Sequence, residues 1–245
     1  MEPEIWALAA LAAFLVGLSK GGLSMMATLA VPVMALAMNP VLAAGLLLPV
    51  FVVSDLFGLI AWRRDVDWRV LLRVVPGSVL GVGLGWATAS LVPAHLVGGL
   101  VGVIGAAFAL WALIRPPLPD APARHPRWLA GGFWGSVAGY TSFVSHSGAP
   151  PYQVYVQPLR LGRQAYAGTI TVFFAITNAV KLIPYAALGQ LSPQNLHIAA
   201  SLVPAALAGV AVGVWAVRRV SERVFYLFIT WALLAVSVRL MADAV

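Results

Sequence analysis

The stretch that decides the fold is Ser19-Lys20-Gly21-Gly22, which interrupts an apolar segment over residues 3–37. As one continuous helix, those roughly 35 residues would extend about 50 Å, well beyond a hydrocarbon core of about 30 Å. A hairpin folded at residues 19–22 fits instead, with each arm dipping part-way into the bilayer and returning. A similar segment over residues 128–158 is broken at residues 145–151, which read Ser145-His146-Ser147-Gly148-Ala149-Pro150-Pro151.

The composition is that of a membrane protein. Hydrophobic residues make up 61% of the 245 residues and charged residues 9%, whereas about a quarter of a soluble domain is charged. Uncharged runs such as residues 21–54 exceed the roughly 20 residues of a spanning helix. We therefore expect an all-α polytopic membrane protein. The net charge of +7 comes from arginines in short loops, which is typical of membrane topology and not of nucleic-acid binding. The chain has no cysteine, so thiolate metal sites are excluded, and we expect neither a metal nor a cofactor.

Two stretches share the same internal spacings, which indicates a duplicated unit of about 100 residues. One is Asp55-x6-Trp62 followed by Pro76-x4-Gly81-x3-Gly85, and the other is Asn178-x6-Tyr185 followed by Pro204-x4-Gly209-x3-Gly213. We expect a first repeat over residues 1–114, a cytoplasmic linker over 115–127 and a second repeat over 128–245. The first would contain the hairpin 3–37 and spans over 40–62, 69–91 and 94–114. The second would contain the hairpin 128–158 and spans over 164–188, 196–217 and 223–242.

The arginines favour hairpins over full spans at the two broken segments. With a hairpin and three spans in each half, nearly all arginines fall on one side, and Arg239 is the exception. With full spans, the Arg63 and Arg218 clusters would fall on opposite sides. The positive-inside rule then makes the arginine side cytoplasmic, inverts the two repeats and leaves both termini non-cytoplasmic. The arginines on that side are Arg63, Arg64, Arg69, Arg73, Arg115, Arg124, Arg127, Arg160, Arg163, Arg218, Arg219 and Arg223.

Two inverted hairpin tips that meet near the midplane would enclose a cavity suited to an anion. Irregular backbone survives at membrane depth where it lines a cavity, and helices that begin at the tips direct positive dipole ends into it. Lys20 adds a full positive charge at the first tip, and His146 lies at the second. A lysine that snorkels to the surface and a satisfied buried histidine are the alternatives. The predicted substrate-binding residues are Lys20, Gly21, Gly22, Ser145, His146, Ser147, Gly148 and Gln153.

Three polar residues inside the spans form a second group of candidates. Asp55 occupies the repeat position of Asn178, and Lys181 lies about one turn further along. An ion pair of Asp55 with Lys181 or Lys20 is one interpretation, and proton coupling through Asp55 is the other. A further set of polar side chains has two equally open interpretations, hydrogen bonds to an anion or hydrogen bonds across helices. The set is Tyr152, Gln153, Thr169, Thr171 and Thr177.

Several of these motifs resemble the TauE/SafE sulfite exporter family. The opening Gly17-Leu-Ser-Lys20-Gly-Gly-Leu-Ser, the Asn39-Pro40 turn and Gly135-x3-Gly139 before the second break carry the resemblance, which covers essentially the whole chain. It implies a permease in the bacterial cytoplasmic (inner) membrane for sulfite, a sulfonate or another small organosulfur anion. By position, Lys20 to Gly22 match the first glycine motif and Ser145 to Gly148 the second. This chain has Ser-His-Ser where many members have glycines.

The expected function is a secondary transporter, with an anion channel and an intramembrane hydrolase as alternatives. The sequence has no nucleotide-binding loop pattern, and a channel would need a continuous pore. A hydrolase would pair Ser145 or Ser147 with His146, but no acidic residue near the tip would orient the histidine. The expected partners are a small anion and the lipid bilayer, with no catalytic residues, and a homo-oligomer is left open.

Labelling of single cysteines tests the topology, because the natural chain contains none. We expect a cysteine at Met1 to react from the non-cytoplasmic side and one at Ser221 from the cytoplasmic side. Reaction of both positions from the same side would contradict the hairpin topology.

Overall fold

In the computed structural model, the chain is described over residues 2–62, 64–89, 91, 94–114, 125–217, 230–231, 233–238 and 241–242, and the described residues form helices and no strand. The first half contains α1 (Pro3–Lys20), η1 (Ser24–Met26), α2 (Ala27–Ala35), α3 (Pro40–Trp62), α4 (Trp68–Ala89) and α5 (Ala94–Ile114). The second contains α6 (Trp128–Ser145), α7 (Ala149–Val156), η2 (Gln157–Leu159), α8 (Arg163–Ala187) and α9 (Pro193–Val217). Of the last expected span, 223–242, residues 230–231, 233–238 and 241–242 are helical, and the other half lies outside the described residues.

Local chemistry sets the helix ends. Asn39 Oδ1 accepts a hydrogen bond from the Val41 N–H at 2.9 Å and begins α3, and Asp67 Oδ1 does the same for the Arg69 N–H at 2.9 Å in α4. After α1, Gly22 has a φ of 117°, which glycine adopts without steric cost.

The two breaks are each three residues long. The first covers residues 21–23, between the end of α1 at Lys20 and the start of η1 at Ser24. The second is shorter than the 145–151 expected, because α7 resumes at Ala149 and holds Pro150 and Pro151 in its first turn, where proline is tolerated. The helix α1 is also longer than an arm that dips only part-way into the bilayer. Its 18 residues are enough, by length and composition, to span the membrane.

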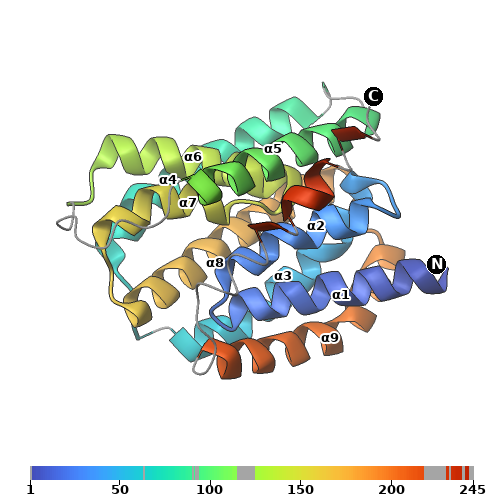
Figure 1. Cartoon of the computed structure of the whole chain (residues 1–245), viewed down its shortest axis with the longest axis horizontal. Coiled ribbons are helices and arrows are strands. Elements are labelled where there is room, and N and C mark those ends of the chain that lie inside the picture. The colour runs from blue at the N-terminus through green and yellow to red at the C-terminus, as the bar shows by residue number, and fades with distance from the viewer. Residues whose placement is uncertain are drawn as a thin grey trace.

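The two hairpins lie toward opposite ends of the molecule. Figure 1 shows α1 and α2 toward the end that carries the N mark, and α6 and α7 toward the other end. The arms of each hairpin pack against one another, and α3 and α8 pack together in the interior.

Helices α4 and α6 pack with their backbones in contact. A Cβ added at Gly81 would overlap the carbonyl oxygen of Ser136, and one at Gly139 would overlap the carbonyl oxygen of Ser78. Small residues allow such close approach of helices in lipid.

Helices α1 and α9 make the corresponding contact. A Cβ at Gly209 would overlap the carbonyl oxygen of Phe14, and one at Gly17 would overlap that of Ala206. Gly209 holds the repeat position of Gly81, so in both pairs a hairpin arm of one half packs on a span of the other half. The two-repeat organisation and the inversion of the repeats stay predictions.

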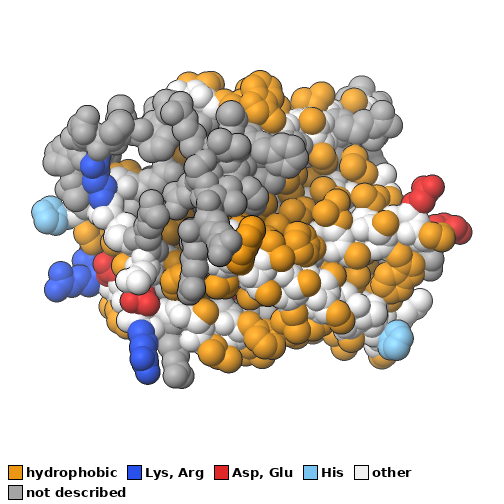
Figure 2. Space-filling model, turned by 60° about the horizontal axis from the view of Figure 1, so that its bottom comes forward, with side chains coloured by type: hydrophobic (Ala, Val, Ile, Leu, Met, Phe, Trp, Pro, Cys, Tyr) orange, Lys and Arg blue, Asp and Glu red, His pale blue; other side chains and the backbone are white. Residues whose placement is uncertain are grey.

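The outer surface is apolar between charged ends. Ile60 is 71% exposed, Leu80 66% and Leu129 86%, a surface that suits lipid tails and not water. Figure 2 shows hydrophobic side chains across the middle of the view and charged ones at its two ends. Among the described residues, α1, α3, α4, α8 and α9 are each long and apolar enough to cross a membrane. The protein is therefore a multi-pass membrane protein.

The described arginines gather at one end. The Arg73 guanidinium lies 5.1 Å from the centre of the Trp128 ring, and the Tyr155 hydroxyl donates to the carbonyl of Arg127 at 3.3 Å. Figure 2 shows Lys and Arg side chains at this end, while acidic and histidine side chains appear at both ends. The remaining predicted positions lie outside the described residues, namely Arg63, Arg115, Arg124, Arg218, Arg219, Arg223 and Arg239, together with the side chain of Arg163.

Candidate functional site

Both hairpin tips contribute to one buried cavity of about 20 Å³. Lys20 reaches it from the end of α1 and His146 from the residue after α6, while Asn178 reaches it from α8. A cavity of this size holds about one water molecule. Its walls are formed by Ser19, Lys20, Ser24, Ala27, Phe51, Ser142, His146, Ala149, Ile170, Thr171, Phe174 and Asn178.

Asp55 joins three helices on one side of this cavity. Its Oδ1 forms an ion pair with Lys20 Nζ at 2.5 Å, and its Oδ2 accepts a hydrogen bond from Asn178 Nδ2 at 2.6 Å. All three side chains are buried. Of the two ion pairs predicted for Asp55, the structure forms the one with Lys20. Asp55 and Asn178 are also equivalent positions in the predicted sequence repeat.

Lys181 lies on the other side with uncharged partners. Its Nζ donates to Ser142 O at 3.1 Å and Ser142 Oγ at 3.0 Å, and lies 2.7 Å from His146 Nδ1. These three acceptors match the three donors of an ammonium group. Lys181 is 0% exposed, and among the described residues no carboxylate forms an ion pair with it.

An aromatic ring lies between the two lysines. The centre of the Phe51 ring is 5.3 Å from Lys20 Nζ and 5.9 Å from Lys181 Nζ. The His146 ring packs on Phe51 with centroids 4.5 Å apart. Lys20 also lies over Phe174 at 5.6 Å. The negative face of an aromatic ring stabilises a nearby cation.

The buried charges do not balance. Within the part of the chain that the structure describes, the buried lysines and acids are Lys20, Asp55 and Lys181. With both lysines charged, one positive charge remains in excess. A buried charge without a counter-ion is costly, so the site favours an anion.

The other predicted site residues do not line the cavity. Ser145 Oγ donates to Thr141 O at 3.3 Å, and Ser147 Oγ donates to Ser145 O at 3.3 Å. Because a break this short lets both hydroxyls turn back to the backbone, neither forms the serine–histidine pair of a hydrolase. Gln153 Nε2 donates to Ser24 Oγ at 3.4 Å and so contacts the wall from behind.

The predicted glycines act in packing and in the turn. A Cβ at Gly21 would meet the backbone of α9, and one at Gly148 would meet Ala138 O at 2.7 Å. Gly22 supplies the positive φ of the first turn. Backbone donors at the second tip are also fewer than expected, because Pro150 and Pro151 have no N–H.

The polar residues that the sequence analysis named within the spans lie in different places, some at the cavity and others at contacts between helices. Thr171 lines the cavity. Thr177 Oγ1 instead lies 2.8 Å from Ser78 Oγ, and Thr169 Oγ1 accepts from the Asp67 N–H at 2.9 Å. The hydroxyl of Tyr152 is buried without a hydrogen-bond partner.

The sequence analysis did not predict several residues of the cavity wall, namely Ser19, Ser24, Phe51, Ser142 and Phe174. One signal was available, because Thr171, Phe174 and Asn178 recur at helical spacing and therefore share a face of α8.

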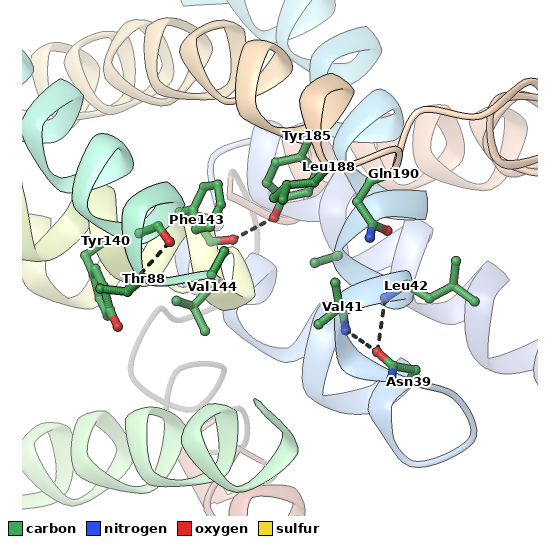
Figure 3. A pocket seen from close by; sticks show the side chains of 13 residues that line it. Asn39, Val41, Leu42, Thr88, Tyr140, Phe143, Val144, Tyr185, Leu188 and Gln190 are labelled. Atoms are coloured by element: carbon green, nitrogen blue, oxygen red, sulfur yellow. Dashed lines mark hydrogen bonds between the residues drawn. The ribbon is translucent and has the colours of Figure 1, made fainter. Parts of the chain in front are cut away.

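A larger, mainly apolar pocket of about 450 Å³, here called the vestibule, lies on the other side of His146. Its inner wall includes Ala44, whose carbonyl lies 3.0 Å from His146 Nε2, and Tyr185, whose hydroxyl donates to Phe143 O at 2.6 Å. Figure 3 shows this bond, with Asn39 and Gln190 across the pocket. The residues that line the vestibule are Asn39, Val41, Leu42, Ala44, Gly85, Thr88, Ala89, Tyr140, Phe143, Val144, Tyr185, Leu188 and Gln190.

Comparison with known proteins identifies a family. The family model described as "Sulfite exporter TauE/SafE" matches residues 9–240, nearly the whole chain. Comparisons with curated proteins and with solved structures found no match.

The Lys20–Asp55 pair makes a prediction for stability. Asp55→Leu alone should cost about 3–5 kcal/mol, because it leaves a buried lysine unpaired. Lys20→Met combined with Asp55→Leu should cost far less, since no charge is left alone. Thermal unfolding in detergent measures both. A double variant as unstable as the sum of the single variants would contradict the pairing.

Proposed function

Because the chain belongs to the sulfite exporter TauE/SafE family of membrane transporters, we propose that it carries a small sulfur oxyanion or sulfonate, bound in the cavity between its two hairpin tips. The observation that carries this proposal is the burial of two lysines, Lys20 and Lys181, with one acid, Asp55, around the site. An anion bound there would stabilise both lysines in their charged form. Hydroxyl and amide groups of Ser24, Thr171 and Asn178 would supply hydrogen bonds to its oxygens.

The size of the cavity implies a closed state. A cavity that holds about one water is too small for an anion with three oxygens. The walls must therefore separate for the anion to enter. Two hairpins that approach from opposite ends and pack on the spans of the opposite half suit rocking of one half against the other, as in alternating access.

The vestibule supplies an exit path. It lies at the end of the molecule where the α2–α3 and α8–α9 turns meet, away from the described arginines. The positive-inside rule assigns the arginine end to the cytoplasm, so the vestibule opens on the non-cytoplasmic side of a bacterial cytoplasmic membrane. Both termini would then be non-cytoplasmic, although Met1 and residues 243–245 lie outside the described residues.

A transporter accounts for the described residues better than a channel does. A channel requires a continuous pore. Here the hydrogen bonds from His146 to Ala44 and from Tyr185 to Phe143 close the wall between vestibule and cavity. The lipid bilayer is the expected surrounding, and the oligomeric state is left open.

Anion flux in proteoliposomes tests the proposed function. Lys181→Gln keeps hydrogen-bonding capacity and removes the charge. A charge about 6 Å from an anion contributes roughly 3 kcal/mol at an effective dielectric of about 20, so we expect sulfite or methanesulfonate flux to fall at least about tenfold.

Ser201→Ala, an exposed change on α9, serves as the matched control and should leave flux unchanged. Equal flux from Lys181→Gln and the control variant would remove Lys181 from the site. A wild-type protein that moves neither anion would contradict the proposed function.

A further inference from the structure

His146 is held in a backbone conformation that residues other than glycine adopt at an energetic cost. Its φ is 53°, in the left-handed region, directly after α6. Histidine is among the residues that tolerate this region best, but the position still needs support from its surroundings. The ring gains that support by bonding at both nitrogens, to Ala44 and to Lys181.

The two bonds limit how many protons the pair can hold. Nε2 lies 3.0 Å from a carbonyl oxygen, which accepts only, so Nε2 carries a hydrogen. Nδ1 lies 2.7 Å from Lys181 Nζ. One hydrogen fits between two nitrogens at this distance, because two N–H groups directed at each other would repel. This hydrogen belongs either to Lys181, as an ammonium or a neutral amine that donates to a neutral ring, or to an imidazolium that donates to a neutral amine.

The same heavy-atom frame accepts each arrangement, because Lys181 keeps at least one hydrogen for the oxygen atoms of Ser142, which lie 3.0 and 3.1 Å away. While the N–H···N bond is intact, the pair therefore carries at most one positive charge, and a further proton requires the two nitrogens to separate.

The surrounding titratable groups provide no negative charge for a second proton. On α1, Lys20 is paired with Asp55 of α3. On α8, Tyr185 has its ring 6.1 Å from His146 and directs its hydroxyl to Phe143 O. An anion in the cavity, which His146 and Ser142 line, is the charge that would stabilise a doubly protonated pair.

We infer that each anion bound in the cavity brings one proton onto the His146–Lys181 pair, so that the protein binds anion and proton together. This inference rests on the proposed function. The proton comes from solvent and bonds to the pair, the N–H···N bond opens, and the freed Nδ1–H of His146, which lines the cavity, donates to an oxygen of the anion. No other bond is made or broken. The ring is placed for this role, because it lines the cavity and bonds to Ala44 of the vestibule wall.

Proton uptake on anion binding tests the inference. The full chain in detergent and weak buffer is mixed with methanesulfonate near neutral pH, and a pH indicator reports the protons taken up. Methanesulfonate is a strong-acid anion, so any uptake belongs to the protein. The wild type and Ser201→Ala should each take up about one proton per anion bound, with binding followed separately by thermal shift.

His146→Asn is the informative variant. Asparagine tolerates a positive φ and has a donor and an acceptor, but does not take up a proton at neutral pH. We expect this variant to bind the anion with uptake reduced to near zero. A wild type that binds without uptake, or a variant that takes up as many protons as the wild type, would overturn the inference and leave the proposed function standing. A wild type that binds no anion would overturn both.

Discussion

The rest of the structure depends on the burial of two lysines beside one aspartate at the depth where the hairpins end. Lys20, Asp55 and Asn178 join α1, α3 and α8 through contacts of 2.5 and 2.6 Å. Lys181 joins α8 to α6 through Ser142 and His146. Charges at membrane depth are expensive unless they are paired or serve a function. Here one pair is complete, and the other lysine has hydrogen bonds without a counter-ion. This difference between the two lysines is the basis of the proposed anion site.

Close backbone packing holds the tips at this depth. The arms α1 and α6 end at the cavity because each packs along a span of the other half, where glycines such as Gly17 and Gly139 leave no room for a Cβ. Toward the vestibule, the wall includes the hydrogen bonds of His146 to Ala44 and of Tyr185 to Phe143.

Much of the fold follows from the sequence, because lengths of apolar runs and the residues that stop helices act locally. Pro40, Trp62 and Ala187 bound helices within a residue or two of the expected spans. The site follows less well. Both Lys20 and Lys181 were possible ion-pair partners of Asp55, and their expected depth in the membrane does not distinguish them. Ser145 and Ser147 were expected in the cavity, yet both turn to nearby carbonyls. Residues of the cavity wall such as Phe51 belong to no sequence motif, and only their position on one face of a helix places them at the cavity.

The central claim is that the anion binds between Lys20 and His146. Its most direct test is an anomalous difference map of crystals grown with selenite, whose selenium marks the position of a sulfite-like anion. The account predicts a selenium peak in the cavity, with oxygens near Lys20, His146 and Asn178, and walls further apart than in the closed state. A selenium peak in the vestibule or among the arginines, with none between the hairpin tips, would contradict it.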